Sequence, residues 1–398
     1  MSATTPIQPV DEAAVPRARS LPVLDAPLAL AVLGLCACSY VTLHGLGAAA
    51  GGPALAKRQA IYDAGGLVLA LLVSRLDYSR LRSLRYGLFG LMVALNVIVF
   101  AMPARQNAHR WIPFPLFSFQ SSEFGKVLII VALAAFVVDR SRRLHQWRTT
   151  LRIMLLAILP ALIVIPQPDL GTAMVYVAVG FSVLFFAGTP FRQLGALVAL
   201  FAGAIVAALV VAPLLGVHVL HGYQLDRLTA FLNPSSCANL PPSVPNPCYQ
   251  VHQAVIAIGE GQKTGLGVHA YQTRLGFLPV DYTDFVFASI GETYGFVGAA
   301  VVLSLYALII WRGLRIVAMA KNLFGTLIAA GIVAMLMFQV FVNIGVTIGI
   351  MPVTGVPLPL ISYGGSSAIV TLISIGLLQS IYIQARLAQA GKGRVLVA

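Results

Sequence analysis

Long apolar segments constrain this chain more than any other feature. Ten of them follow one another between residues 27 and 385, while charged residues make up only 10% of the 398 residues. A bilayer core of roughly 30 Å asks for about 20 mostly apolar residues in each helical span. The segments do not alternate apolar and polar residues, which argues against barrel strands. The sequence predicts helices near residues 27–46, 60–75, 84–103, 122–139, 150–166, 170–188, 192–213, 284–311, 323–350 and 366–385.

The predicted fold class is all-α: a polytopic integral membrane protein with about ten transmembrane helices, because so much apolar surface requires lipid around it. Residues 1–26 hold four prolines without apolar periodicity and predict a disordered cytoplasmic tail. Residues 27–388 are the predicted membrane domain, and residues 389–398 are a second cytoplasmic tail. The longest connection, residues 214–283, is a large extracytoplasmic loop between the seventh and eighth predicted helices.

Basic residues account for the net charge of +13, and they gather in alternate short loops. This is the positive-inside pattern of cytoplasmic loops. It predicts a multi-pass protein of the inner (plasma) membrane, with both termini cytoplasmic. A nucleic-acid-binding face would gather the same charge in one patch, so no nucleic-acid partner is expected. The clustered residues are Arg75, Arg80, Arg82, Arg85, Arg140, Arg142, Arg143, Arg148, Arg152, Arg312, Arg315, Lys321, Arg386, Lys392 and Arg394.

Ionisable residues near the predicted spans are functional candidates, because a charge at membrane depth is costly. Only 13 acidic residues are present, so each one in such a position is informative. Arg110 and Arg227 add positive charge from the predicted outer loops. The candidates at the outer ends of predicted helices are Glu123, Lys126, Asp169, Asp281, Asp284 and Glu292.

Asp281 and Asp284 lie three residues apart where the eighth predicted helix begins. They would share a face if that turn is helical. Two close carboxylates raise the proton affinity of one of them, which suits a general base. Acidic side chains near a helix N-terminus also stabilise the helix dipole. Spacing alone leaves catalysis and capping equally open.

The other candidates also have structural explanations. Glu123 and Lys126 could form an intrahelical ion pair, or Lys126 could meet a phosphate. Asp169 follows two prolines and could cap the next helix. The Tyr-Gly-Gly-Ser-Ser segment that ends with Ser366 and Ser367 could present backbone N–H groups to an anion, or could simply begin a helix.

Two segments besides the long loop are unusual. Residues 351–367 are apolar but contain three prolines and three glycines. Such backbone is tolerated at membrane depth only where protein buries it or where it lines a wet cavity. Residues 104–121 mix arginines with aromatic side chains, which is typical of a segment at headgroup depth. All three segments lie on the predicted outer face and indicate one cavity there.

Cysteine is sparse in this chain. Cys237 and Cys248 lie in the predicted outer loop, where a disulfide between them would close a loop of about a dozen residues. Two free thiols are the alternative. No cysteine or histidine spacing resembles a zinc site.

Ordered motifs along nearly the whole chain resemble the SEDS family of cell-wall polymerases (shape, elongation, division and sporulation), which includes RodA and FtsW. Residues 345–355 are more similar to RodA than to FtsW. The motifs that carry the resemblance are Arg110-Trp111-Ile112, Phe119 through Lys126, Gln167 through Thr172, Arg227 through Pro234, Tyr249-Gln250, Ala257-Ile258-Gly259, Phe277-Leu278-Pro279, Thr283-Asp284-Phe285, Gly291-Glu292, and Asn343 through Ser367.

The resemblance implies a glycosyltransferase that joins lipid II units into peptidoglycan strands outside the cytoplasmic membrane, beside a class B penicillin-binding protein. The family's catalytic aspartate falls on Asp284. One departure stands close to it, because Asp281 occupies a segment where the family commonly has glutamate and histidine. By the same match, the residues that line the cavity would be Arg110, Glu123, Lys126, Asp169, Arg227 and Glu292.

We expect Asp284 to act as the general base on the acceptor hydroxyl, with Arg110, Lys126 and Arg227 near the leaving pyrophosphate. The polyprenyl tail would lie between helices, against residues such as Phe114 and Phe117, with membrane lipid as a further partner. The sequence does not decide whether a divalent cation, Mg or Mn, assists. Two alternatives remain: a flippase for lipid-linked sugars, and a catalytically silent scaffold for a penicillin-binding protein.

Overall fold

The structure is a computed structural model. It describes residues 24–46, 51–102, 111–113, 118–207, 214, 227, 231, 247–274, 278 and 282–395. Three of the predicted site residues, Arg110, Asp281 and Cys237, lie outside these described residues.

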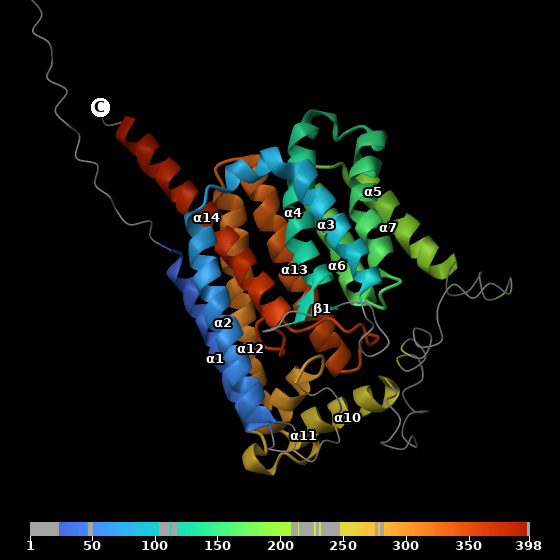
Figure 1. Cartoon of the computed structure of the whole chain (residues 1–398), viewed down its shortest axis with the longest axis vertical. Helices are drawn as coiled ribbons and strands as arrows, with labels where there is room; N and C mark the ends of the chain where they lie inside the picture. Colours follow the sequence, from blue (N-terminus) through green and yellow to red (C-terminus); the bar gives the residue numbers. More distant parts are fainter. Residues whose placement is uncertain are drawn as a thin grey trace, which may run out of the picture.

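The chain forms a helical bundle (Figure 1), and every predicted span falls on one of its helices. Seven of the described helical segments are long and apolar enough to cross a membrane, and two further helices are apolar but shorter. The prediction of an all-α, multi-pass membrane protein is therefore confirmed. The helices on which the predicted spans fall are α1 (Ala26–Gly45), α2 (Gly52–Arg75), α3 (Arg85–Ile98), α4 (Ser121–Asp139), α5 (Trp147–Val164), α6 (Leu170–Phe186), α7 (Phe191–Val206), α12 (Val286–Met319), α13 (Leu323–Thr347) and α14 (Gly365–Val395).

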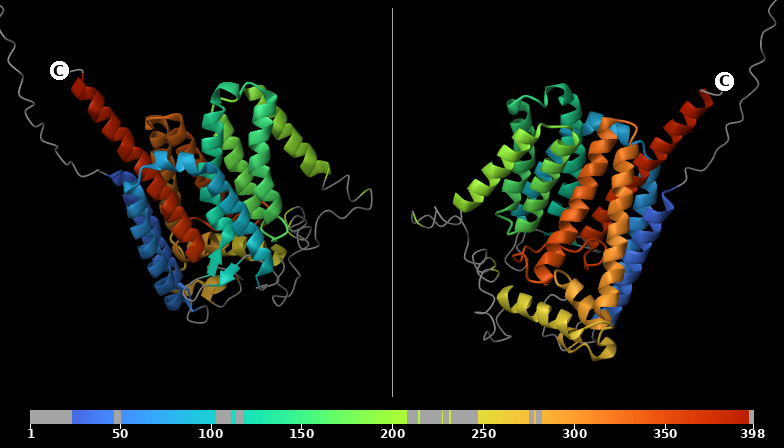
Figure 2. Two further views of the ribbon diagram at one scale, coloured as in Figure 1. Left: turned by 45° about the horizontal axis from the view of Figure 1, so that its top comes forward. Right: turned by 180° about the vertical axis from the view of Figure 1, so that it is seen from behind.

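The two ends of the bundle differ in their contents. One end, called here the basic end, holds the short arginine-rich connections, where Arg82 Nη2 lies 2.8 Å from Asp139 Oδ1. The Tyr78 hydroxyl donates to Asn322 at the same end, over 3.2 Å. The opposite end, called here the α10 end, carries α10 (Pro247–Glu260) and α11 (Tyr271–Arg274), with α10 lying across the bundle (Figures 1 and 2). Helix α4 ends at the basic end with Asp139, so its first turn, which holds the candidate Glu123, lies toward the α10 end.

Described structure extends beyond both predicted limits of the membrane domain, while the limits of the domain itself stay a prediction. Asp25, assigned to the disordered tail, is buried and caps α1 by accepting from Leu28 N at 3.0 Å. Its carboxylate also accepts from Arg312, and its backbone N–H donates to Gln379. At the other limit, α14 continues to Val395, beyond the predicted end at residue 388. Contacts between residues hundreds of positions apart order Asp25, and local sequence patterns do not reveal such contacts.

A stripe of small residues on α2 allows α14 to approach closely, which is typical of membrane helix pairs. Ala56, Gly66, Ala70 and Ser74 are all buried on this stripe. A Cβ atom at Gly376 of α14 would lie only 2.6 Å from the backbone oxygen of Ala70. The α2–α14 contact therefore depends on the absence of a side chain at position 376.

Gly376→Ala is expected to lower the free energy of unfolding by about 1–3 kcal/mol, because the obstacle is backbone that cannot move aside cheaply. The measurement is unfolding of the purified protein in mixed micelles by titration with denaturing detergent. Gly65→Ala on α2 is the control, since a Cβ there meets no atom within 4 Å. Equal stability of the two variants would contradict the close-packing argument.

Helix α12 is broken near the α10 end. Gly295 has φ 63° and ψ −160°, a conformation open essentially only to glycine. The loop after α10 fills the break: Phe296 N donates to Gln262 O at 2.9 Å, and Val297 N donates to Lys263 O at 3.1 Å. The second part of α12 thus begins with its first N–H groups already bonded, and the first part takes its own direction.

Residues 104–121, predicted to lie at headgroup depth, contain a short hairpin within their described part. Strands β1 (Trp111–Pro113) and β2 (Ser118–Gln120) are antiparallel, with Trp111 opposite Gln120. Strand β2 leads directly into α4. Three-residue strands leave too little periodicity to be predicted from sequence.

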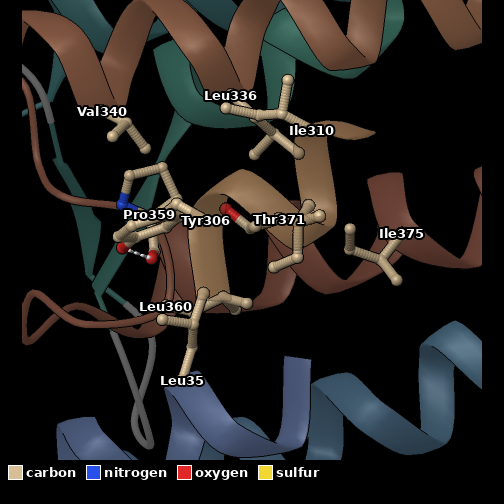
Figure 3. Close-up of a pocket in the computed structure, with 10 residues that line it drawn as sticks. Leu35, Tyr306, Ile310, Leu336, Val340, Pro359, Leu360, Thr371 and Ile375 are labelled. Carbon is tan, nitrogen blue, oxygen red and sulfur yellow. Dashed lines mark hydrogen bonds between the residues drawn. The ribbon is translucent and has the colours of Figure 1, made fainter. Parts of the chain in front are cut away.

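Residues 351–364 are non-helical and lie buried or half-buried between helices, which is one of the two settings that their composition allowed. The buried Tyr306 hydroxyl of α12 donates to Pro359 O (Figure 3). The gap beside this contact is only about 10 Å³ and is walled by Leu35, Leu336 and Ile375 among others. This gap is far too small for a substrate, so the segment is tightly packed on the side that faces Tyr306.

Candidate active site

Asp284 lies in the turn of residues 282–285, immediately before α12 begins at Val286. The turn is clamped from two sides. Asn343 Nδ2 of α13 donates to Asp284 O and to Val356 O, both at 2.8 Å. Ser362 Oγ donates to Thr283 O. These contacts fix the backbone on either side of Asp284.

Asp284 and Arg227 converge on Gly355. A Cβ atom at Gly355 would lie 3.8 Å from Asp284 Oδ2 and 3.9 Å from Arg227 Nη1. The carboxylate and the guanidinium are therefore within about 8 Å of each other, by adding the two distances. Gly355 has φ +74°, so a side chain there would be strained, although its Cβ would meet both groups only at ordinary van der Waals distance. The backbone at Gly355 therefore lies beside both an acid and a cation.

A cavity of about 240 Å³ adjoins this pair, because Arg227 is also one of its walls. His252 is the other side chain in the lining that can carry charge, and the rest is mainly apolar. Carboxylate, guanidinium and cavity thus meet at the α10 end of the bundle. The cavity is lined by Arg227, Phe231, Cys248, Val251, His252, Val255, Ile348, Gly349, Met351 and Val353.

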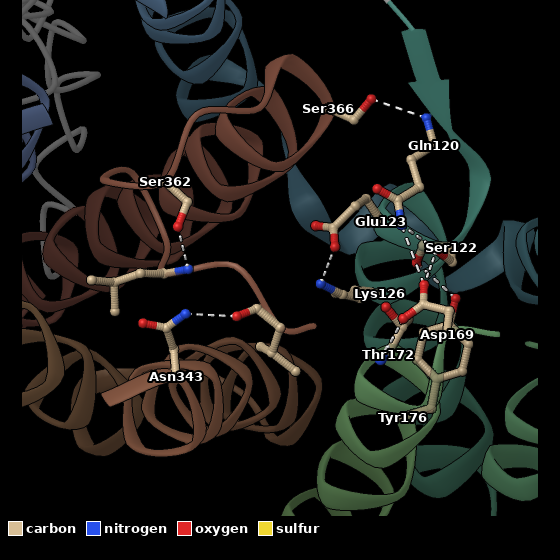
Figure 4. A network of polar contacts seen from close by, with 12 residues as sticks. Gln120, Ser122, Glu123, Lys126, Asp169, Thr172, Tyr176, Asn343, Ser362 and Ser366 are labelled. Carbon is tan, nitrogen blue, oxygen red and sulfur yellow. Dashed lines mark hydrogen bonds and ion pairs between the residues drawn. The ribbon is translucent and has the colours of Figure 1, made fainter. Parts of the chain in front are cut away.

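A second group of polar residues joins the start of α4 to the start of α6 (Figure 4). Asp169 caps α6 by accepting from Thr172 N at 3.1 Å. The same carboxylate accepts from Ser122 Oγ at 2.8 Å and from Gln120 Nε2 at 3.3 Å. Asp169 therefore caps its helix, as one interpretation of the sequence held, and also ties α6 to α4.

Glu123 and Lys126 form a buried ion pair within this group, with Lys126 Nζ 2.5 Å from Glu123 Oε1. Their side chains are 3% and 1% exposed. The intrahelical pair considered from the sequence is thus present. An ammonium group has three N–H donors, and no acceptor other than Glu123 is found for Lys126 within the described part of the chain. The predicted phosphate contact stays a prediction.

The segment 354–366 connects the two groups. A Cβ atom at Gly171, two residues after Asp169, would lie 2.9 Å from Thr354 O, so α6 begins against this segment. At its other end, Ser366 Oγ accepts from Gln120 N at 3.0 Å. Gly355, which faces Asp284 and Arg227, lies between these two contacts. Segment 354–366 therefore contacts both the α4–α6 group and the Asp284 group and places them around one region.

Glu292 has a different setting, because it is fully buried in the first part of α12. Its carboxylate accepts from Gln272 N at 2.7 Å and Thr273 N at 2.9 Å, and also from the Thr273 hydroxyl. These contacts hold α11 against α12. The predicted place of Glu292 in the cavity wall stays untested. Ser367 is buried in the first turn of α14.

Sequence reasoning assigned no role to three buried polar side chains near the site. The side-chain oxygens of Gln339, Asn343 and Thr354 have no hydrogen-bond partner among the described residues. Gln339 and Asn343 lie four residues apart in an apolar span, and this spacing was the available signal. Buried oxygens without a partner are costly and are normally bonded to water or a ligand.

Three cysteines lie among the described residues. Cys248 is disulfide-bonded, and Cys36 and Cys38 are free thiols. Cys237, the partner predicted from the sequence, lies outside the described residues. Within the described ranges, no three histidine, cysteine or acidic side chains gather as a metal site.

The fold and the site define a multi-pass membrane protein in which a carboxylate and a guanidinium meet beside a cavity at one end of the bundle. The chain belongs to the family of FtsW, RodA and SpoVE cell cycle proteins, whose model matches residues 23–387. This confirms the family predicted from the motifs.

Individual relatives agree with this assignment. The peptidoglycan glycosyltransferase MrdB of Escherichia coli K12 is 37% identical over 322 residues, which cover 80% of this chain and 82% of that protein. A chain in a solved peptidoglycan synthase complex matches with a TM-score of 0.75 and 31% identity, over 91% of this chain and 98% of that one. RodA of Thermus thermophilus matches with a TM-score of 0.64 and 29% identity, over 92% and 97% of the two chains.

Proposed function

We propose that the chain is a peptidoglycan glycosyltransferase that polymerises lipid II into glycan strands during cell elongation or division. The observation that carries the proposal is the convergence of Asp284 and Arg227 on Gly355 beside the 240 Å³ cavity. The family membership and the activity named for MrdB support the same enzyme class. Lipid-linked substrates also explain why such an enzyme is built within a membrane.

In the proposed reaction, the Asp284 carboxylate takes the proton from the acceptor sugar hydroxyl. The hydroxyl oxygen forms a bond to the anomeric carbon of the donor, and the bond from that carbon to the pyrophosphate oxygen breaks. The leaving group is a lipid pyrophosphate, and in this proposal Arg227 stabilises it. Arg110 and Lys126 are further candidates for this contact. A Mg or Mn ion bound to the pyrophosphate stays a prediction of the sequence, and no step here depends on it.

The proposed orientation puts the basic end in the cytoplasm and the α10 end outside, following the positive-inside rule. Both termini are then cytoplasmic, in the inner membrane, and the site faces the compartment where glycan strands are needed. A class B penicillin-binding protein is the proposed partner, since a similar chain occurs in a peptidoglycan synthase complex. Phe114 and Phe117, proposed to contact the polyprenyl tail, lie outside the described residues.

The test is polymer formation from lipid II by the purified full-length protein in detergent or liposomes. Wild-type protein is expected to produce glycan strands, resolved by length on gels. Liposomes that carry labelled lipid II also report movement between leaflets. Movement without strand formation would overturn the proposal and favour a flippase, and absence of both would favour the silent scaffold.

A further inference from the structure

Helix α2 carries two polar side chains that the proposed reaction does not use. Gln59 is 0% exposed and Asp63 is 5% exposed. They lie four residues apart, on the same helix face as the small residues that contact α14. Burying a carboxyl group and an amide in a membrane bundle is costly unless they have partners or a role.

Both polar groups of the Gln59 side chain are bonded. Gly364 N donates to Gln59 Oε1 at 3.1 Å, and Gln59 Nε2 donates to Asp63 Oδ1 at 3.0 Å. Because the backbone N–H of Gly364 only donates, the amide oxygen of Gln59 must face it, which leaves the amide N–H to donate to the Asp63 carboxyl group. Asp63 therefore fixes the Gln59 amide, and Gln59 holds the backbone at Gly364.

Gly364 belongs to the turn that supports Asp284. Tyr363 N donates to Tyr282 O at 2.8 Å, and Ser362 Oγ donates to Thr283 O. Residues 282 and 283 directly precede Asp284 in the chain. The turn of residues 362–364 is thus bonded to α2 on one side and to the catalytic segment on the other.

Aromatic rings fill the remaining space between α2 and the catalytic segment. The Tyr363 ring lies between Tyr62 and Tyr282, with centroid distances of 6.4 Å and 6.0 Å. A Cβ atom at Gly365 would lie 3.2 Å from the Tyr62 ring, so the start of α14 is packed tightly against α2. The side chains here are closely packed, so a shift of the turn of residues 362–364 would also move Tyr282.

We propose that Gln59 and Asp63 are positioning residues for Asp284. Asp63 orients Gln59, Gln59 anchors Gly364, and the turn holds Tyr282 and Thr283, which fixes the carboxylate of Asp284 against the acceptor. The inference rests on the proposed role of Asp284 as the base. Misplacement of a catalytic group by about 1 Å can cost roughly 10²-fold in rate, so a remote anchor of this kind affects kcat.

The test uses three α2 variants in the lipid II polymerisation assay. Gln59→Glu sets two carboxylates against each other and is expected to lower kcat at least about 10-fold with KM unchanged. Gln59→Glu with Asp63→Asn exchanges donor and acceptor and restores both bonds, so kcat is expected to recover to within about 3-fold of wild type. Gln59→Met with Asp63→Leu removes both polar groups from the apolar interface, and it should fold yet keep the low kcat.

Ile61→Ala is the matched control, because Ile61 is on the exposed face of α2; its kcat should equal that of wild type. Failure of the exchange variant to recover, or wild-type kcat in the apolar variant, would overturn the positioning role. Strands from wild-type protein together with wild-type kcat in Gln59→Glu would also overturn it, while leaving the proposed function standing. If wild-type protein makes no strands, the proposed function fails and this inference fails with it.

Discussion

Replacing Asp284 by asparagine is expected to lower the rate of glycan-strand formation from lipid II by roughly 10²- to 10⁴-fold, the usual contribution of a general base. Asparagine has nearly the same size and cannot take the acceptor proton. The contacts that hold the turn involve backbone oxygens of residues 283 and 284, which the substitution leaves in place. The protein should therefore fold normally, and the loss should appear in kcat.

The measurement compares initial rates of polymerisation for purified wild type and Asp284→Asn at saturating lipid II. Asp284→Glu is the companion variant, because it keeps the carboxylate but displaces it by one methylene; an intermediate rate is expected. Glycan strands formed by Asp284→Asn at the wild-type rate would remove Asp284 from the reaction, whatever the family resemblance implies.

Lys126→Met is expected to lower the free energy of unfolding by about 3–5 kcal/mol, because it leaves the buried Glu123 carboxylate without its cation. Glu123→Leu combined with Lys126→Met removes both charges and should recover most of that stability. Unfolding by denaturing detergent measures both. Polymerisation by the stable double variant then separates the two roles of the pair: a large loss of activity supports the phosphate contact of Lys126.

Arg82→Ala at the basic end is the matched control for the buried pair. Arg82 and Asp139 form an exposed ion pair, with side chains 47% and 26% exposed. Removing such a pair typically costs about 0–1 kcal/mol. If Arg82→Ala and Lys126→Met lower the free energy of unfolding by similar amounts, then burial does not make loss of the Glu123–Lys126 pair more costly than loss of an exposed pair.

The fold was largely predictable from the sequence, because lipid requires apolar helices and leaves few alternatives. The spans follow from local composition, and burial of residues 351–364 is one of the two settings that their composition allowed. The start of α1 and the end of α14 do not follow from it. Asp25 lies among prolines and resembles a tail residue, yet besides capping α1 it contacts Arg312 and Gln379, which are far away in the sequence. The break of α12 at Gly295 is likewise hidden, because the loop that fills it comes from an earlier part of the chain.

The candidate site was predictable as a set of residues but not as an arrangement. Asp284 and Arg227 could be named from motifs, yet their meeting at Gly355 depends on three segments distant in sequence. The spacing of Glu123 and Lys126 predicts an ion pair equally well in water and in a core. Asn343 and Gln59 carry no charge and so gave no electrostatic signal, although Asn343 bonds directly to the backbone oxygen of Asp284.

The break at Gly295 divides α12 into two parts that different contacts hold in place. The part after the break, Phe296–Met319, takes its starting hydrogen bonds from Gln262 and Lys263, whereas the part before it carries the turn with Asp284. The lipid-facing residues of the longer part can therefore vary with membrane thickness and composition without rotating the turn that carries Asp284. Glycine is required at position 295 itself, since any side chain there would collide with Gly265 and Lys263.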